Sequence, residues 1–459
     1  MARAKKETAL TPEERLQAAL VPDWEWPYKL PENWCWVKAS AVARIYTGNS
    51  ISEKIKADKY AGQQEGLLFI ATKDIGFDNA INYETDIRIP DYPNFKIAPA
   101  NTALLCIEGG SAGRKVGFVN REVCFGNKLC VFAAEKVNSK FIYYILQSQY
   151  FIQQFNNRKH GLIGGVSVND LAEIGFPLSP LAEQQRIVDR IESLFAKLDE
   201  AKEKAQAVVD SFETRKAAIL HKAFTGELTA KWRRIHGLSL DTWKEVAADS
   251  LFEYVTSGSR GWAKYYDESG AVFIRMGNLD HGTIELDFSD IQHVKLPNKA
   301  EGQRSRIRKN DILISITADV GMVGLVRNDD FEGYINQHIA LARPVMSESA
   351  EFIAWYLVSD IGLKQMQEKQ RGATKVGLSL NDIRALQLKI PLIEEQDEIL
   401  KVIKMWIGKE QQSQEAAEAV LDQIDLMKKS ILARAFRGEL GTNDPSEESA
   451  VELLRNSIN

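Results

Sequence analysis

The sequence predicts an α+β protein: two domains of mixed helix and strand, related by a pseudo-twofold internal repeat and separated by two long coiled-coil helices. Three observations support this fold. A stretch at residues 180–228 has heptad spacing, a second stretch at residues 391–440 repeats its letters, and short β-rich runs precede each of them.

The first helical stretch has apolar residues at alternating steps of four and three, which is a narrow coiled-coil seam. Pro180 suits a first helical position, Glu183 lies where the helix dipole favours an anion, and Gly226 suits a left-handed cap. Because so long a helix cannot bury its seam alone, we expect it to pair with the second stretch. The predicted seam residues are Ile187, Ile191, Leu194, Leu198, Val208 and Phe212, with Ile399, Val402, Val420, Ile424 and Ile431.

The two helical stretches differ slightly in spacing along the chain. The Pro-Leu starts lie 211 residues apart, at 180 and 391, whereas the Ala-Phe ends lie 212 apart, at 223 and 435. We therefore expect one residue to have been gained inside the second helix, near its polar run at 409–414, where the seam is weakest.

The mixed domains repeat as well. Trp36 has Trp243 as its expected counterpart, and residues 66–75 align with 270–279. The letters between such matched positions differ almost completely, which indicates one task carried out on two different targets. The predicted parts are an N-terminal arm at 1–29, mixed domain 1 at 30–179, spacer helix 1 at 180–229, mixed domain 2 at 230–390, spacer helix 2 at 391–441 and a C-terminal tail at 442–459.

Both termini carry short helical patterns. Thr11, Pro12 and Glu14 indicate a capped helix that runs to about Leu20, and the aromatic residues after it suggest a docked arm. The tail predicts a short amphipathic helix, which either closes the second copy or faces solvent.

The composition is that of an ordinary globular protein. Of 459 residues, 44% are hydrophobic and 26% charged, and the formal net charge of −5 is weak evidence about nucleic acid. We find no apolar run of membrane length and no signal peptide. The four cysteines form no CxxC pair, so we expect no disulfide framework or zinc cluster and a reducing, cytoplasmic location.

Motifs for catalysis are missing from the sequence. We find no HExxH, no Rossmann fingerprint and no Asn-Pro-Pro-Tyr/Phe stretch, and the six histidines suggest no triad. The glycine-rich run at 109–115 lacks the Gly-Lys-Ser/Thr ending of a phosphate loop, so we expect a hairpin turn there. The sequence therefore predicts a non-catalytic chain with no metal site.

Polar loops in matching places of the two copies are candidates for nucleic-acid contact. Asn, Gln and Arg can read base edges, and Arg and Lys can bind phosphates. For any single loop residue an ordinary turn is the simpler interpretation, and the basic pair Arg306 and Arg308 fits a solvated edge strand equally well. The candidates are Asn49, Ser50, Lys54, Lys56, Lys73, Asn127, Lys128 and His160 in the first copy, and Ser259, Arg260, Trp262, Lys264, Arg275, Asn278, Arg306, Arg308, Asn336, Gln337, His338, Arg371 and Lys375 in the second.

Taken together, the chain resembles the specificity subunits of type I restriction-modification systems over essentially its whole length. The motifs that carry this resemblance are doubled or paired. They are the Pro-Leu-x-Glu-x-Gln starts at 180–185 and 391–396, the Ala-Phe-x-Gly-Glu-Leu ends at 223–228 and 435–440, the Asn-Trp-x-Trp-Val opening at 33–37 and the Asn336-Gln337 pair.

The resemblance implies two target-recognition domains separated by two long antiparallel coiled-coil helices. Each domain would read one half of a bipartite asymmetric DNA sequence, and the helices would set the spacer. The implied partners are double-stranded DNA, two modification (methyltransferase) subunits and two restriction subunits. The chain would bind no cofactor itself. S-adenosylmethionine would belong to the modification subunits, and ATP and Mg²⁺ to the restriction subunits.

Two other classes stay open from the residues alone. A coiled-coil scaffold for two protein partners would show little salt dependence and no DNA retention, whereas DNA binding weakens steeply with salt. A stand-alone nuclease or methyltransferase would need motifs that we do not find.

Overall fold

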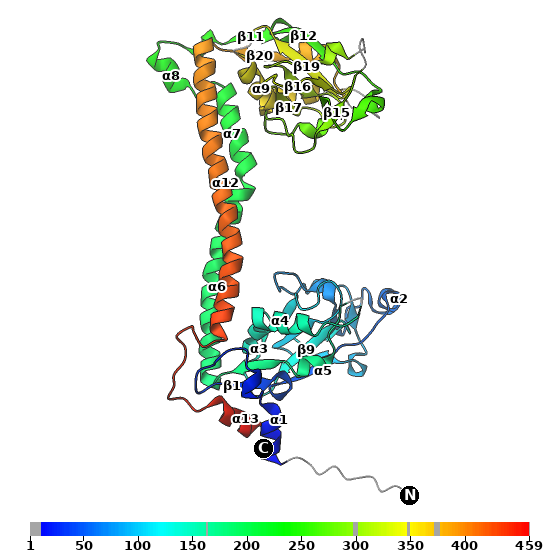
Figure 1. Ribbon diagram of the computed structural model, residues 1–459, viewed down its shortest axis with the longest axis vertical. Coiled ribbons are helices and arrows are strands. Elements are labelled where there is room, and N and C mark those ends of the chain that lie inside the picture. The colour runs from blue at the N-terminus through cyan, green and yellow to red at the C-terminus, as the bar shows by residue number, and fades with distance from the viewer. Residues whose placement is uncertain (1–10, 162–163, 297–301, 347–348, 371–376, 459) are drawn as a thin grey trace. The chain divides into compact units, whose positions relative to one another are not determined.

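The computed structural model describes residues 11–161, 164–296, 302–346, 349–370 and 377–458. The chain divides into two compact units: unit 1 comprises Met1–Glu203 and Val420–Asn459, and unit 2 comprises Lys204–Ala419. Two long helices, α6 (Leu181–Asp210) and α12 (Ile393–Ala435), contribute segments to both units. Each unit combines sheets with helices, which confirms the predicted α+β class (Figure 1).

Unit 1 contains two four-stranded sheets. One is antiparallel in the order β2-β9-β6-β7, and the other has the order β4-β3-β8-β5, in which β3 and β8 run parallel. Side chains from both sheets share one apolar core, where Ile70, Leu104 and Phe125 are fully buried. A separate pair, β1 and β10, joins the start of the domain to its end. The strands are β1 (Cys35–Lys38), β2 (Ala43–Thr47), β3 (Leu67–Ile70), β4 (Arg88–Ile89), β5 (Ile97–Ala98), β6 (Thr102–Cys106), β7 (Val116–Val119), β8 (Val123–Phe125), β9 (Leu129–Ala134) and β10 (Gly175–Leu178).

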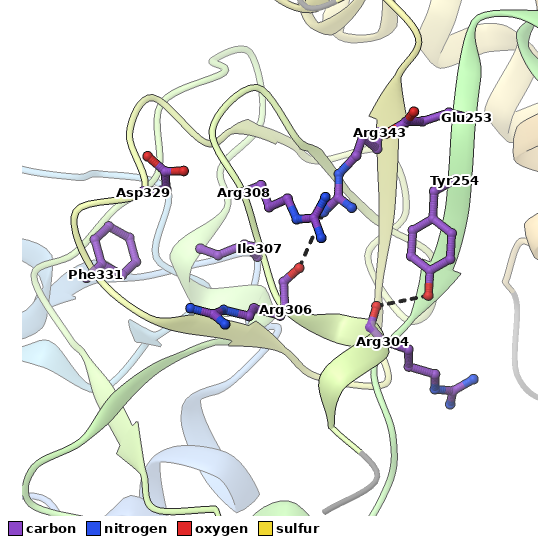
Figure 2. A pocket seen from close by; sticks show the side chains of 9 residues that line it. All are labelled: Glu253, Tyr254, Arg304, Arg306, Ile307, Arg308, Asp329, Phe331 and Arg343. Carbon is purple, nitrogen blue, oxygen red and sulfur yellow. Dashed lines mark hydrogen bonds between the residues drawn. The ribbon is translucent and has the colours of Figure 1, made fainter. Parts of the chain in front are cut away.

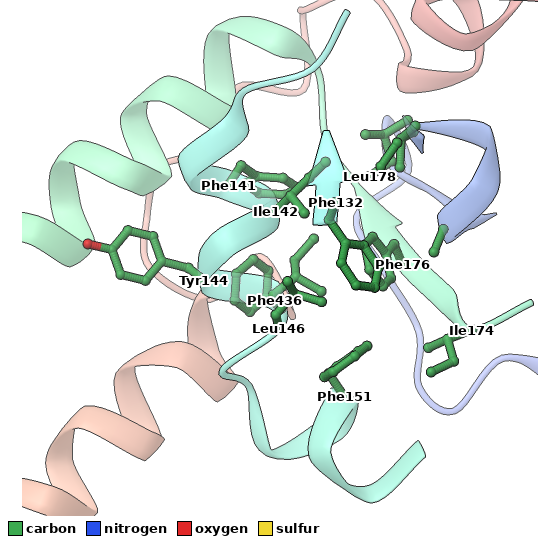
Figure 3. Packing of buried hydrophobic residues seen from close by; sticks show 14 of the residues in the cluster. Phe132, Phe141, Ile142, Tyr144, Leu146, Phe151, Ile174, Phe176, Leu178 and Phe436 are labelled. Carbon is green, nitrogen blue, oxygen red and sulfur yellow. The ribbon is translucent and has the colours of Figure 1, made fainter. Parts of the chain in front are cut away.

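The helices of unit 1 pack into a second core. Figure 3 shows Phe436, which follows α12, among the side chains of α3 and α4, and its ring centroid lies 5.4 Å from that of Phe141. Two helices follow β9 in place of one, because the Ser148 hydroxyl accepts the backbone N–H of Phe151 and starts α4. The helices are α1 (Pro12–Ala19), α2 (Glu53–Ile55), α3 (Ser139–Ile145), α4 (Gln149–Asn157), α5 (Val168–Ala172) and α13 (Ala450–Ile458).

Unit 2 repeats this plan. Its sheets have the orders β12-β19-β16-β17 and β13-β15-β14-β18, with β14 and β18 parallel, and β11 pairs with β20. The strands are β11 (Lys244–Ala247), β12 (Phe252–Ser257), β13 (Tyr266–Asp267), β14 (Ala271–Ile274), β15 (Gln292–Val294), β16 (Ile312–Ser315), β17 (Val323–Leu325), β18 (Gly333–Ile335), β19 (Ile339–Pro344) and β20 (Gln387–Ile390). The helices are α7 (Phe212–Phe224), α8 (Ala230–Ile235), α9 (Ala350–Val358), α10 (Asp360–Glu368) and α11 (Leu380–Arg384).

Helix α12 runs antiparallel to α6 in unit 1 and to α7 in unit 2 (Figure 1). In unit 1 Lys428 forms an ion pair with Asp199, and in unit 2 Arg215 forms one with Glu410. The first helical stretch runs as α6 and α7 with a local distortion at Ser211, whose hydroxyl donates to the carbonyl of Ala207. Backbone hydrogen bonds from Ser211 to Ala207 and from Arg215 to Ser211 carry the helix across this residue, as expected of one long helix.

The burial of the seam residues corrects part of the predicted seam. Ile187, Ile191, Ile399 and Ile424 are buried as expected, but the Val420 side chain is 41% exposed. Ile403 is fully buried next to the half-buried Val402, so it takes the place that Val402 was expected to fill. The remaining seam residues are half-buried, and they are Leu194, Leu198, Val208, Phe212 and Ile431.

Hydrogen bonds reveal the true register of the repeat. The side chain of Gln184 donates to the carbonyl of Ser179, five residues earlier, and Gln396 donates in the same way to Pro391. The helix starts are therefore 212 residues apart, like their ends, and the residue expected to be gained near 409–414 lies before the helix instead. The sequence alignment was wrong by one residue because Glu394 and Glu395 are adjacent. Glu395, and not Glu394, is the counterpart of Glu183.

The two termini behave differently from each other. The capping box of α1 is present, with reciprocal hydrogen bonds between Thr11 and Glu14, as predicted. The expectation that the tail closes the second copy is wrong, because α13 lies beside α1 and buries Ala450 and Leu454 in the core of unit 1 (Figure 1). Within the described ranges, no helix is long and apolar enough to cross a membrane.

Candidate nucleic-acid interface

Two loops meet at one end of the sheets in unit 1. The first follows β2, and the second follows β8. Asn49 in the first loop donates its backbone N–H to the carbonyl of Phe125, and Asn127 in the second donates to the carbonyl of Asn49. A Cβ atom at Gly48 would lie 2.0 Å from the Phe125 oxygen, so only glycine allows this approach. The side chain of Asn127 is exposed next to this contact.

In unit 2 the two equivalent loops make the same contact, but with different residues. A Cβ atom at Gly258 would lie 2.1 Å from the carbonyl oxygen of Ile335, so the loop after β12 packs against the loop after β18. Asn336 donates its backbone N–H to Ile274, whereas in unit 1 it is Gly126 that donates to Ile70. The counterpart of Asn127 is therefore Gln337, and Asn336, which has the same side chain as Asn127, is instead the counterpart of Gly126.

The next residue in each loop makes a matching side-chain contact. In unit 1 the ammonium group of Lys128 lies 3.5 Å from the Glu108 carboxylate. In unit 2 His338 occupies that position, and its Nδ1 lies 2.5 Å from the Thr317 hydroxyl. The Nε2 atoms of Gln337 and His338 are 2.8 Å apart, which orients the Gln337 amide. One frame thus presents two different sets of polar groups.

Three predicted contact residues of unit 2 have structural roles instead. Trp262 is 5% exposed and stacks on Phe273 with ring centroids 4.8 Å apart, so it belongs to the core. Asn278 is 4% exposed, and its amide bonds to three backbone groups around a turn. Asn336 is 9% exposed, and its side-chain oxygen accepts the backbone N–H of His338. The sequence cannot distinguish an aromatic or amide side chain that faces inward from one that faces solvent.

The other candidates of unit 1 lie on the surface. Lys56 forms an ion pair with Glu53 at 2.7 Å and lies over the Phe69 ring, so it is less free than its neighbours. His160 lies 3.8 Å from the Asp170 carboxylate. The exposed candidates are Ser50, Lys54 and Lys73.

The remaining candidates of unit 2 also include engaged groups. Arg275 forms an ion pair with Asp290 at 2.9 Å, and the Ser259 hydroxyl accepts a hydrogen bond from Arg304 at 3.2 Å. Arg260 and Lys264 are exposed. Arg371 and Lys375 lie outside the described residues.

Arg306 and Arg308 do not lie on a regular strand. Arg306 makes an isolated bridge with Tyr334 after a short helical turn at Gln303–Ser305. The alternation still holds, since Arg304, Arg306 and Arg308 are exposed while Ser305 and Ile307 are buried. Figure 2 shows these arginines with Arg343 around a cavity of about 590 Å³. Sequence reasoning missed Arg343, because it comes from β19 and joins the other arginines only through the fold.

Two buried carboxylates, which sequence reasoning missed, anchor the mixed domains to the helices. Glu183 is fully buried and accepts hydrogen bonds from the Trp34 indole at 2.7 Å and from Asn443. Glu395 is also fully buried, and it accepts from the Trp243 indole at 2.9 Å and from Arg233. Trp243 is therefore equivalent to Trp34, and its predicted equivalence to Trp36 is wrong.

The described residues offer little for a metal or for redox chemistry. No three His, Cys, Asp or Glu side chains among them are grouped to hold a metal ion. All four cysteines are buried free thiols. Burial raises the pKa of Cys130 to about 12 and that of Cys124 to about 11.

Comparison with known proteins identifies the family. The family described as "Type I restriction modification DNA specificity domain" matches residues 31–209 and again residues 241–418. The type I restriction enzyme EcoBI specificity subunit of Escherichia coli is 25% identical over 435 residues, which cover 89% of this chain and 86% of that protein. This chain therefore belongs to the family of type I restriction-modification DNA specificity proteins, and it carries two such domains.

Solved structures show the same fold. The HsdS subunit from Thermoanaerobacter tengcongensis aligns with a TM-score of 0.59 at 19% identity and covers 91% of this chain and 100% of that one. A chain from a structure concerned with complex assembly and conformational transition of the type I R-M system gives a TM-score of 0.69 at 18% identity, covering 90% of this chain and 100% of that one.

Proposed function

We propose that this chain is the non-catalytic specificity subunit of a type I restriction-modification complex. Each mixed domain reads one half of a bipartite, asymmetric DNA target. The observation that supports this most directly is the contact between two loops that both units share. It presents Asn127 beside Lys128 in unit 1 and Gln337 beside His338 in unit 2. Different polar side chains at equivalent loop positions of the two domains would suit two DNA half-sites of different sequence.

Asn127 and Gln337 are the base readers that we propose. An Asn or Gln amide can pair bidentately with adenine in the major groove, through its carbonyl oxygen and its N–H. His338 occupies one N–H of the Gln337 amide and leaves the oxygen and the other N–H for a base edge. Asn49, Ser50, Lys54, Lys73, Arg260 and Lys264 would position the DNA around these readers.

We propose that the paired helices set the unread spacer between the half-sites. α12 is helical without interruption over 43 residues, which corresponds to about 64 Å at 1.5 Å per residue. A helix resists bending where a flexible linker would not. Deleting one heptad from both helical stretches should change the spacer and leave both half-sites unaltered, and an unchanged spacer would contradict this role.

The partners that we propose are two modification subunits and two restriction subunits. The relatives that support this are named as specificity subunits of type I restriction enzymes. S-adenosylmethionine would be held by the modification subunits, and ATP and Mg²⁺ by the restriction subunits. Exposed apolar side chains on α12 are candidates for docking in each unit, and they are Met405 and Trp406 in unit 2 and Val420, Leu426 and Met427 in unit 1. A subunit that acts on cellular DNA would work in the cytoplasm.

Two single variants test the reading of half-sites. Gln337→Ala should relax the second half-site by about 1–3 kcal/mol per lost bidentate contact and leave the first unchanged. Asn127→Ala should do the reverse. Binding measured on DNAs with one half-site altered at a time would separate these effects, and equal losses at both half-sites would contradict the proposal. Arg260 and Lys264, replaced together by Ala, should likewise weaken only the second half-site.

A further inference from the structure

Unit 2 has a cavity that is lined by four arginines. Arg304, Arg306 and Arg308 come from the segment before β16, and Arg343 comes from β19 (Figure 2). Tyr254, Ile307, Phe331, Glu253 and Asp329 complete the wall. The cavity holds about 590 Å³ and opens to solvent, so it can admit a group from a large ligand.

The four arginines are not equivalent. Arg343 makes two hydrogen bonds of 2.7 Å to Asp311, a fully buried carboxylate that also accepts the backbone N–H of Arg308. Burial raises the pKa of Asp311, and Arg343 opposes that shift. This pair therefore fixes the floor of the cavity and the backbone of Arg308. The Arg343 guanidinium also donates to the carbonyl of Arg306.

The other three guanidinium groups are bonded less extensively than that of Arg343, and Arg304 donates to the Ser259 hydroxyl. Among the described residues, no carboxylate lies within 4.0 Å of the guanidinium of Arg304, Arg306 or Arg308. Glu253 and Asp329 also line the cavity but do not pair with these three arginines. The three arginines and two carboxylates leave a net charge of about +1 on the cavity wall, since Arg343 is balanced by Asp311. A cavity lined by this excess of positive charge favours an anionic group over a cationic one.

Unit 1 lacks this feature although it has the same frame. Ile97 pairs with β8 where Arg306 pairs with Tyr334 of β18, and Asn101 and Asn310 both adopt positive φ at the following turn, 59° and 70°. The register is therefore fixed over the whole segment. The residues at the positions of Arg304, Arg306, Arg308 and Arg343 are Phe95, Ile97, Pro99 and Ala133.

We propose that the arginine cavity of unit 2 binds backbone phosphates of DNA beside the second half-site, a contact for which unit 1 has no counterpart. This inference rests on the proposed function. The cavity adjoins the loop after β12, because Arg304 donates to the Ser259 hydroxyl of that loop at 3.2 Å. A guanidinium matches two phosphate oxygens with parallel N–H donors. Phosphate contacts orient the duplex without reading its sequence, so they can strengthen one half-site independently of its bases.

The test compares two triple variants of the full chain, assembled with its modification subunits. The first replaces Arg304, Arg306 and Arg308 by Gln, and the control replaces three exposed lysines of the same unit by Gln, with the same loss of charge. The control positions are Lys244, Lys364 and Lys389. Affinity for the mapped DNA site is measured between 50 and 200 mM salt. Each phosphate contact contributes about 0.9 to the slope of log affinity against log salt, so the slope of the arginine variant should be smaller by about 2.7. Between 50 and 200 mM salt, the affinity of that variant should therefore fall by a factor about 40 times smaller than that of the unaltered protein.

A second measurement uses the unaltered protein, so it does not depend on the folding of a variant. Phosphates beside one half-site are replaced by neutral methylphosphonates. Neutral groups beside the second half-site should lower the salt slope more than the same groups beside the first. Equal changes of the salt slope at both half-sites, or an arginine variant with the same slope as the control, would overturn the cavity proposal. The proposed function would still stand in that case if binding remained specific for the DNA sequence. Binding that ignores the half-site sequence would instead overturn the proposed function.

Discussion

Replacing Arg233 by Met removes the cation from a buried cluster that joins α8 to the start of α12. The Glu395 carboxylate has no exposed surface and accepts hydrogen bonds from Arg233, Thr229 and Trp243. Removing one partner of a buried ion pair leaves an uncompensated charge, which costs about 3–5 kcal/mol. A unit of about 200 residues loses roughly 2–4 °C of melting temperature per kcal/mol, so its transition should fall by roughly 6–20 °C.

Calorimetry gives the size of this loss, and hydrogen exchange assigns it to unit 2. The double variant Arg233→Met with Glu395→Gln should be more stable than Arg233→Met alone, because it removes both charges together. Glu183→Gln in unit 1 is the matched comparison. Glu183 has indole, amide and hydroxyl donors but no cation within ion-pair distance among the described residues. A loss below about 1 kcal/mol for Arg233→Met would refute the claim that Arg233 and Glu395 form a buried ion pair.

Other predictions follow from the same contacts. Trp262→Ala should destabilise the protein by about 3–5 kcal/mol in denaturant titrations, whereas Lys264→Ala should change stability by less than about 0.5 kcal/mol; unchanged stability of the Trp262 variant would contradict its place in the core. Gly258→Ala should open the loop contact at a cost of about 1–3 kcal/mol, seen as faster hydrogen exchange around Ile335, and unaltered exchange would argue against the close approach. Because their thiol pKa values are raised by burial, Cys124 and Cys130 should react with iodoacetamide at pH 8 at least about 100-fold more slowly in the folded protein than in denaturant; equal rates would contradict this.

The sequence predicted the parts of this fold that rest on local pattern. The heptad positions Ile187 and Ile191 are buried, and Gly226 has a φ of 82° at the end of α7. The local distortion at Ser211 escaped prediction, because it depends on a single hydroxyl that bonds its own helix. The register of the repeat was misjudged by one residue, because Glu394 and Glu395 are interchangeable by letter and differ only in burial.

The candidate interface was predicted less well than the frame. An exposed Asn127 and a buried Asn278 carry the same side chain, and only the backbone groups around Asn278 show that its amide is fully engaged. Likewise, Trp262 follows Arg260 in the sequence like a stacking platform for bases, yet its ring covers Phe273. Arg343 joins the arginine cavity across the sheet, a contact between strands that no local pattern reveals.

Mapping methylated adenines in the DNA of cells that express this chain with its modification subunit is the most direct test of the central claim. The account predicts methylation at one bipartite motif, with two specified half-sites separated by a fixed number of unspecified bases. It also predicts that Gln337→Ala relaxes one half-site only. Methylation without a motif, a single continuous motif, or relaxation of both half-sites by that one substitution would contradict it.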